Sequence, residues 1–175
     1  YKQPKSGMIR NAGDLLRHYQ QLVANYPIIS IEDGIGEDDF QSHALLTKSL
    51  VVQTVGDDLF VTNPERIRLG VLHHAANAVL IKPNQIGTVS ETLNAMKTAR
   101  DMGLSCIVSH RSGDTEDTFI ADLAAATCCG QIKTGAPARA ERTSKYNRLL
   151  MIEHELGSYA RFAGGSTIKN LFPEQ

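Results

Sequence analysis

The chain contains no tryptophan, only three cysteines, and no excess of either charge sign. Because its formal net charge is −1, it lacks the basic surplus that binds DNA or RNA, and we expect no nucleic-acid partner. No apolar run approaches the roughly 20 residues that a membrane-spanning helix needs, and no signal peptide opens the chain. These absences favour a small-molecule partner and a cytoplasmic location.

The cysteines fit neither a disulfide framework nor a zinc site. Cys128 and Cys129 are adjacent and Cys106 lies in a strand-like segment, so the set is odd in number and lacks paired CxxC spacing. We interpret all three as reduced thiols in the core.

Five short apolar segments recur along the chain, and each is followed by charged or polar side chains. Counted through Glu32, Asp57, Lys82, His110 and Lys133, these groups are 25, 25, 28 and 23 residues apart, and each step is the length of one strand, one helix and two loops. The repeat therefore predicts parallel β/α units rather than hairpins. The segments are 27–31 before Glu32, 51–55 before Asp57, 78–81 before Lys82, 105–108 before Ser109, His110 and Arg111, and 130–132 before Lys133.

Apolar spacing and terminal glycines place helices between these segments. This pattern predicts helices over 14–25, 90–102, 116–129 and 138–156, and it predicts that Ser90 caps the second of them. We expect the alanine-rich helix 116–129 to lie close to the sheet and the residues after Gly165 to form a surface tail.

The repeats predict an α/β fold, an incomplete TIM-type (β/α)8 barrel. A closed barrel of this class has eight strands, whereas about five units are recognisable here. No linker or low-complexity segment divides residues 1–175, so we expect one incomplete domain. Because the chain begins with Tyr1 in a loop-like segment, we also expect a fragment that lacks the first barrel strands. In such barrels, function lies at the carboxyl ends of the strands.

The predicted strand ends carry the groups of a metal-assisted proton transfer. Glu32 and Asp57 offer hard oxygen ligands of the kind that Mg²⁺ prefers, although acidic loops are often plain solvated turns. Lys82 leaves a buried strand, and a neighbouring metal would favour its neutral form, which can accept a proton. The alternative is a lysine that merely pairs with a carboxylate at the barrel rim.

A second group of strand-end residues suits an anionic substrate. Arg111, between hydroxyl groups and Gly113, can grip a phosphate bidentately, or it can pair structurally with Asp114 or Glu116. His110 either contacts substrate or orients a neighbour. Lys133 is a further fixed cation that would stabilise a carboxylate carrying extra negative charge.

Taken together, five motifs resemble the enolase (phosphopyruvate hydratase) family, in the family's order and spacing and over nearly the whole chain. These motifs are Ser30–Asp33, Val55–Pro64, Leu80–Thr88, Ser109–Asp117 and Gln131–Gly135. The resemblance implies that residues 1–175 are the carboxy-terminal part of the catalytic barrel domain, about its last five βα units. It also implies that the amino-terminal capping domain and the first strands lie outside this chain.

The resemblance further implies a lyase that reversibly dehydrates 2-phosphoglycerate to phosphoenolpyruvate in glycolysis and gluconeogenesis, with two Mg²⁺ ions and a homodimer when full length. By motif position, Glu32 and Asp57 would be metal ligands, Lys82 the base, and Lys133 a contact to the substrate carboxylate. The closing loop would bring Arg111 to the phosphate and a serine near the second metal; its residues are Ser109, His110, Arg111 and Ser112.

Two departures bear on these expectations. The third metal-binding aspartate and the glutamate acid of the family would precede Tyr1, so we expect this fragment alone to be inactive. Met151 stands where many members carry an arginine of the subunit contact. A truncated, non-catalytic enolase-like chain with a structural or binding role is the alternative.

Two further clusters are expected to be structural. Four basic residues at helical spacing are interpreted as a solvated helix face: Arg139, Arg142, Lys145 and Arg148. His73 and His74 are interpreted as surface helix residues rather than a metal site, since no third ligand is spaced with them.

Overall fold

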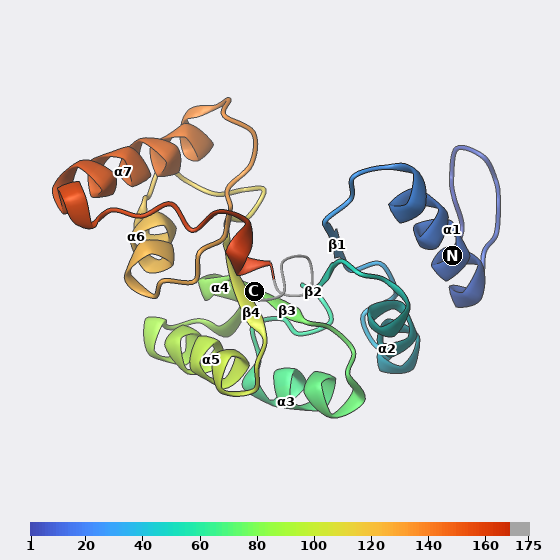
Figure 1. Cartoon of the computed structure of the whole chain (residues 1–175). Coiled ribbons are helices and arrows are strands. Elements are labelled where there is room, and N and C mark those ends of the chain that lie inside the picture. The colour runs from blue at the N-terminus through green and yellow to red at the C-terminus, as the bar shows by residue number, and fades with distance from the viewer. Residues whose placement is uncertain (169–175) are drawn as a thin grey trace.

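A computed structural model, which describes residues 1–168, contains one sheet of five parallel strands in sequence order (Figure 1). All four neighbouring pairs are parallel, so every connection crosses over through helical segments. The strands are β1 Ser30–Glu32, β2 Gln53–Gly56, β3 Ala78–Ile81, β4 Ser105–Ser109 and β5 Ile132–Lys133. The predicted repeat is confirmed, and the fold is an incomplete α/β barrel.

Seven α-helices accompany these strands among the described residues, and two short 3₁₀ helices follow them. They are α1 Ala12–Asn25, α2 Phe40–Ser49, α3 Pro64–His73, α4 Pro83–Ile86, α5 Val89–Asp101, α6 Phe119–Ala126, α7 Ala140–Leu156, η1 Gly157–Tyr159 and η2 Gly164–Thr167. Figure 1 shows α1 and α2 on one side of the strands, α6 and α7 on the other, and α3 and α5 between them. The four predicted helices are present.

Every predicted helix differs from the observed one by a few residues at one or both ends, and two of the starts have a clear local cause. Thr88, not Ser90, caps α5, since its side chain accepts the Glu91 N–H. Helix α6 begins three residues later than predicted because Asp117 accepts the Phe119 N–H in a turn just ahead of the helix.

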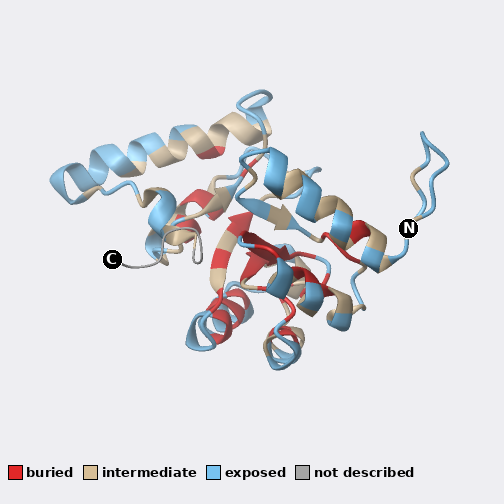
Figure 2. Cartoon of the chain, turned by 45° about the vertical axis from the view of Figure 1, so that its right-hand side comes forward, coloured by how far each residue is buried: buried red, intermediate tan, exposed pale blue. Residues whose placement is uncertain are grey.

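The core depends on the two-residue alternation of the central strand β3. Val79 and Ile81 pack in the large apolar cluster formed with α3, α5 and α6, whereas Ala78 and Leu80 pack in a smaller cluster on the opposite face. All four side chains are fully buried, and Figure 2 shows the buried residues gathered in the strands and the helix faces turned toward them. Burying each larger aliphatic side chain stabilises the fold by about 1.5–3 kcal/mol.

Phe60 fixes the loop that follows β2. The ring is fully buried between Gly56 and Gly70, where a Cβ atom on Gly56 would lie 2.5 Å from Phe60 Cδ2 and one on Gly70 would overlap the ring. Only glycine allows this close approach. The loop that carries Asp57 is therefore held by packing.

Asn77 fastens the start of β3 to β2. Its Oδ1 accepts the Thr54 N–H at 2.8 Å, and its Nδ2 donates to the Val52 carbonyl at 3.1 Å. The side chain thus takes the place of a backbone ladder at the end of the sheet opposite the functional rim.

Several expectations about burial need correction. Cys106 is buried as predicted, but Cys128 is exposed because it lies in a left-handed turn after α6. The basic face of α7 is not uniformly solvated: Lys145 is 1% exposed, and Arg148 pairs with Asp122. The apolar residues of α7 are not all covered either: Leu150 is exposed to solvent.

The segment after Gly164 is only partly a surface tail. The Thr167 carbonyl accepts hydrogen bonds from Ser105 Oγ at 3.4 Å and Gln131 Nε2 at 3.2 Å, so η2 docks at the starts of β4 and β5. The rest of the predicted tail, 169–175, lies outside the described residues. His73 and His74 are exposed at the end of α3, as predicted for surface residues.

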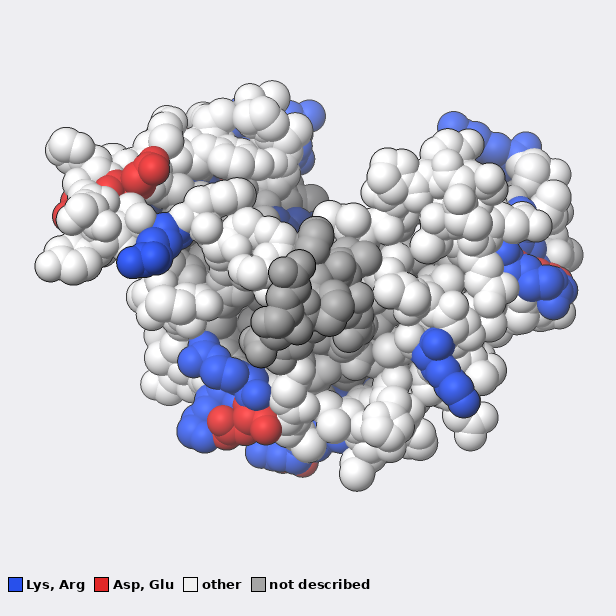
Figure 3. All heavy atoms as spheres, in the orientation of Figure 1, with Lys and Arg blue, Asp and Glu red and all other residues white. Residues whose placement is uncertain are grey.

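Two whole-molecule features bear on possible partners. On the face drawn in Figure 3, Lys and Arg side chains are scattered over separate places, some of them beside Asp or Glu. Within residues 1–168, no helix combines the length and the apolar character needed to cross a membrane.

Candidate active site

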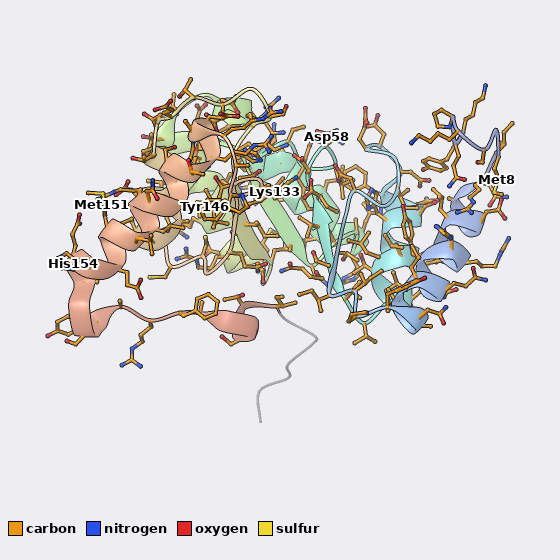
Figure 4. The ribbon with its side chains drawn as sticks, turned by 90° about the horizontal axis from the view of Figure 1, so that it is seen from above. Met8, Asp58, Lys133, Tyr146, Met151 and His154 are labelled. Carbon is orange, nitrogen blue, oxygen red and sulfur yellow. The ribbon has the colours of Figure 1, made fainter. Side chains whose placement is uncertain are left out.

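The carboxyl ends of the five strands form one rim, because all the strands point the same way. Figure 4 shows Asp58 and Lys133 on this side of the sheet and η2 on the opposite side. The rim gathers predicted site residues from every strand: Glu32, Asp57, Lys82, Ser109 and Lys133.

At the centre of the rim, Lys82 donates a hydrogen bond from Nζ to Asp57 Oδ2. The two side chains are only 12% and 9% exposed. Gln85 Nε2 donates to the other Asp57 oxygen at 3.3 Å, and Thr62 links the two strand ends by accepting the Lys82 N–H at 2.9 Å and donating to Gln85 Oε1 at 2.7 Å. The buried carboxylate is thus paired with a cation and an amide.

Asp33 fixes the backbone beside this pair. It has a positive φ of 43°, and its two carboxylate oxygens accept the N–H groups of Asp57 at 2.9 Å and Asp58 at 2.7 Å. Oxygen atoms of Asp33, Asp57 and Asp58 lie within 4.8 Å of one another. Asp33 therefore orients the end of β2 and concentrates negative charge next to Lys82.

A second ion pair joins the first and the last strand. Lys133 Nζ at the end of β5 lies 2.6 Å from Glu32 Oε1 at the end of β1, across 101 positions of the sequence. Its side chains are 44% and 32% exposed, so it is more open to water than the Lys82 pair. Two long side chains thus span the rim between the outer strands.

The loop after β4 presents Arg111 to solvent. Arg111 Nη1 contacts Asn84 Oδ1 at 3.3 Å, while the Arg111 backbone N–H is donated to Asp114 Oδ2 at 3.3 Å. Asp114 therefore binds the backbone of the loop, and the guanidinium points to the loop after β3. Ser109 is buried and donates to the His110 carbonyl at 2.9 Å, whereas Ser112 is exposed.

His110 lies between the rim and α7. Burial, and next the nearby Arg142 charge, lower the pKa of His110 below its ordinary value. Gly135 has φ +81°, and a Cβ there would lie 2.8 Å from Arg142 Nε and 3.0 Å from His110 Cε1. Within residues 1–168, His110 Nδ1 and Arg142 Nε are buried and have no hydrogen-bond partner. The arrangement favours a neutral imidazole.

Carboxylates at the rim are the donors that a hard divalent cation takes, but the acidic cluster found within residues 1–168 consists of Asp33, Asp57 and Asp58 and does not include Glu32. Glu32 and Asp57 follow directly paired strands, and each carboxylate already faces a positive charge, the ammonium of Lys133 or Lys82. Oxygen ligands from one or two carboxylates, completed by water or substrate, are typical of Mg²⁺. No soft thiolate or imidazole belongs to the acidic cluster of Asp33, Asp57 and Asp58 that the described residues form.

Sequence reasoning missed the residues that support these groups. Asn84 and Gln85 lie in α4 and are signalled only by their closeness to Lys82 in the Lys-Pro-Asn-Gln run, whereas Thr62 lies in the loop after β2 and is 20 residues away from Lys82 in the sequence. Lys145 was expected in solvent. Its burial depends on carbonyl groups of a distant loop, which no local pattern indicates.

Comparison with known proteins identifies the family. A family profile described as "Enolase, C-terminal TIM barrel domain" matches residues 2–171. The protein named "Enolase" of Acidothermus cellulolyticus is 58% identical over 160 residues, which cover 90% of this chain and 37% of the relative. The chain thus spans little more than a third of that relative's length. On this match, and on the order of its strand-end residues, the chain belongs to the enolase family.

Proposed function

We propose that the full-length protein containing this chain reversibly dehydrates 2-phosphoglycerate to phosphoenolpyruvate, as a hydro-lyase of glycolysis and gluconeogenesis. The observation that carries this proposal is the buried contact between Lys82 and Asp57 at the ends of adjacent strands. It puts a lysine, the kind of base the reaction needs, beside a carboxylate that suits Mg²⁺. The family membership and the named relative point the same way.

Lys82 is the proposed base. It would take the proton next to the substrate carboxylate at Nζ, and Asp57, whose other oxygen accepts from Gln85, holds that part of the side chain in place. Glu32 and Asp57 would hold Mg²⁺, which would supply charge stabilisation for the negative charge that develops on the substrate carboxylate. Lys133, at the opposite side of the rim, would contact the same carboxylate.

The loop after β4 would bind the other end of the substrate. The exposed guanidinium of Arg111 suits a phosphate, because its planar fork can make two parallel hydrogen bonds. His110, neutral and half-buried, would supply a nitrogen for substrate contact. Ser109 or Ser112 would lie near a second Mg²⁺ ion.

The remaining parts of the proposal concern the setting of the enzyme. We place the full-length protein in the cytoplasm as a homodimer with no nucleic-acid partner, and residues 1–175 within its catalytic barrel domain. The near-neutral charge of the chain and the named relative support this setting. The fragment alone would be inactive, because the family's remaining metal ligand and acid are outside it.

The test is turnover of 2-phosphoglycerate by the full-length protein with Mg²⁺, measured by the absorbance of the enol product. Lys82→Ala should lower kcat by at least about 100-fold, since a positioned general base contributes roughly 10²–10⁴-fold. Lys97→Ala is the matched control, because the Lys97 side chain on α5 is exposed and, among the described residues, its ion pair is with Asp101. Lys97→Ala should leave kcat unchanged.

Two outcomes would count against this function. Activity that survives Lys82→Ala would remove the assignment of the base. A folded, Mg²⁺-supplied protein without any turnover would instead favour the alternative, an enolase-like chain with a structural or binding role.

A further inference from the structure

We propose that Lys145 of α7 is a positioning residue that fixes the loop 110–115, and thereby holds Arg111 where a phosphorylated substrate can reach it. This inference rests on the proposed function, because it assigns Arg111 to the substrate phosphate. Residues 110–115 are called the Arg111 loop below.

Lys145 is buried in a helix whose other residues are half-buried or exposed. It is 1% exposed and is the only buried residue of α7. Its ammonium donates hydrogen bonds to the Thr115 carbonyl and, at 2.6 Å, to the Glu141 carbonyl, and it lies 4.0 Å from Asp114 Oδ2. Burying an ammonium costs several kcal/mol unless acceptors surround it, and here two carbonyl acceptors and a carboxylate 4.0 Å away compensate the charge.

Asp114 links the Lys145 ammonium to the backbone of Arg111. Its carboxylate accepts the Arg111 N–H at 3.3 Å and the Thr115 N–H at 2.9 Å, and its own N–H is donated to the Arg111 carbonyl at 3.1 Å. The turn from Arg111 to Thr115 is thus closed around the carboxylate that faces Lys145. With the turn fixed on one side and Asn84 contacting the guanidinium at 3.3 Å on the other, Arg111 is held from two directions.

Helix α7 does not depend on Lys145 alone for its position. Tyr146 donates to the Gly135 carbonyl, and Arg148 pairs with Asp122 of α6 at 2.7 Å. Figure 4 shows Tyr146 beside Lys133, with Met151 and His154 further along the helix and away from the rim. Removing the Lys145 ammonium should therefore loosen the Arg111 loop while α7 stays attached.

The first test is hydrogen exchange of the full-length protein, which requires no activity. Lys145→Met keeps the apolar stem and removes the ammonium, and we expect the amides of Arg111, Asp114 and Thr115 to exchange at least about 10-fold faster. Arg148→Met is the matched control on the same helix and should leave these amides unchanged. Equal exchange in the two variants would overturn the inference, whatever the protein catalyses.

A second variant tests the contact between Lys145 and Asp114 by changing the residue of the loop. Asp114→Asn removes the charge that faces Lys145 but keeps the shape of the turn, and Asp114 lies in a partly exposed loop. It should raise exchange of the Arg111 amide as well. If Lys145→Met does not fold, unchanged exchange in Asp114→Asn overturns the inference by itself.

The kinetic test is a double-mutant cycle in the active full-length protein. Lys145→Met should lower kcat/KM for 2-phosphoglycerate by about 10-fold to 100-fold, mainly through KM, because Arg111 is displaced. In an Arg111→Ala background the same substitution should change kcat/KM by less than about 3-fold, since nothing remains to be positioned. Lys145→Arg, which restores the charge, should recover part of the loss.

The two proposals fail in different ways. A full loss from Lys145→Met in the Arg111→Ala background would mean general damage and would overturn the positioning role. Absence of turnover in the unsubstituted protein would defeat the proposed function. Faster exchange in Lys145→Met would even then support the anchoring of the Arg111 loop.

Discussion

Lys82→Met tests the buried pair at the centre of the rim through stability rather than activity. Met preserves most of the stem but removes the ammonium, which leaves the Asp57 carboxylate with only the Gln85 amide at 3.3 Å. The Asp57 residue as a whole is 6% exposed, so water has little access to the carboxylate once the ammonium is removed. Removing one member of a buried ion pair costs about 3–5 kcal/mol, because a buried charge is left without compensation.

That cost should be visible in thermal unfolding of the full-length protein with a chelator present. For a domain of this size each kcal/mol moves Tm by about 2–4 °C, so we expect a fall of about 6–20 °C. The matched control is Lys97→Met, whose ion pair with Asp101 is exposed and contributes at most about 0.5 kcal/mol. Circular dichroism measures both midpoints.

Neutralising the carboxylate separates charge from packing. In Asp57→Asn/Lys82→Met the amide needs no counter-charge, so the double variant should recover at least about 2 kcal/mol of the loss. If Lys82→Met unfolds within about 1 kcal/mol of the control, or if Asp57→Asn recovers nothing, the pair does not compensate a buried charge and the reasoning is refuted.

Three further predictions concern the scaffold. Gly70→Ala should destabilise the protein by about 1–3 kcal/mol in urea unfolding, because its Cβ overlaps the Phe60 ring; an unchanged midpoint would mean that the ring moves freely. Asn77→Ala should cost about 1–3 kcal/mol in the same assay, since the Thr54 N–H loses its acceptor and the Val52 carbonyl loses its donor; an unchanged midpoint would mean that water replaces the amide. Burial lowers the pKa of His43 in α2 below 6.5, so the unfolded chain binds a proton more readily than the folded chain. The stability that the neutral imidazole provides is therefore full above pH 6.5 and is lost as the pH falls toward the lowered pKa. In urea unfolding, His43→Asn should lose less stability than the unsubstituted protein between about pH 7 and pH 5.

The strands could be predicted because the local sequence shows both the buried apolar run and the polar residue at which the run ends. β3 was predicted to the residue, since four fully buried apolar side chains stop at a charged one. For α3 only the helical character around His73 was predicted and not the bounds, although Asn63-Pro64 is a clear start, with the Asn63 side chain accepting the Glu65 N–H at 2.8 Å. The apolar face of α3 is hard to recognise in the sequence because one of its two buried residues is Gly70, which has no side chain.

The pairings at the rim could not be predicted in the same way. Asp57 and Lys82 were each placed at a strand end, and pairing with a rim carboxylate was one of the two interpretations of Lys82, but which carboxylate it meets depends on the register of β2 and β3. The contact of Lys133 with Glu32 depends on how far the sheet curves between its outer strands, which no local pattern encodes. Lys145 was misplaced because helical spacing alone describes neighbours on the same helix and not the loop that covers it.

The two ion pairs explain how charged groups remain stable at a partly buried rim before a ligand binds. Each acid at a strand end faces a lysine, so the charges of Glu32, Asp57, Lys82 and Lys133 cancel in pairs. In the proposed reaction the carboxylates would bind a divalent cation in place of their lysine partners, the Lys133 ammonium would face the anionic substrate, and Lys82 would act as a neutral amine that takes the proton. Each carboxylate then still faces a positive charge, and none is left buried alone. Neutralising both members of the buried Lys82–Asp57 pair should therefore spare the fold and remove the function, whereas neutralising one of them should damage both.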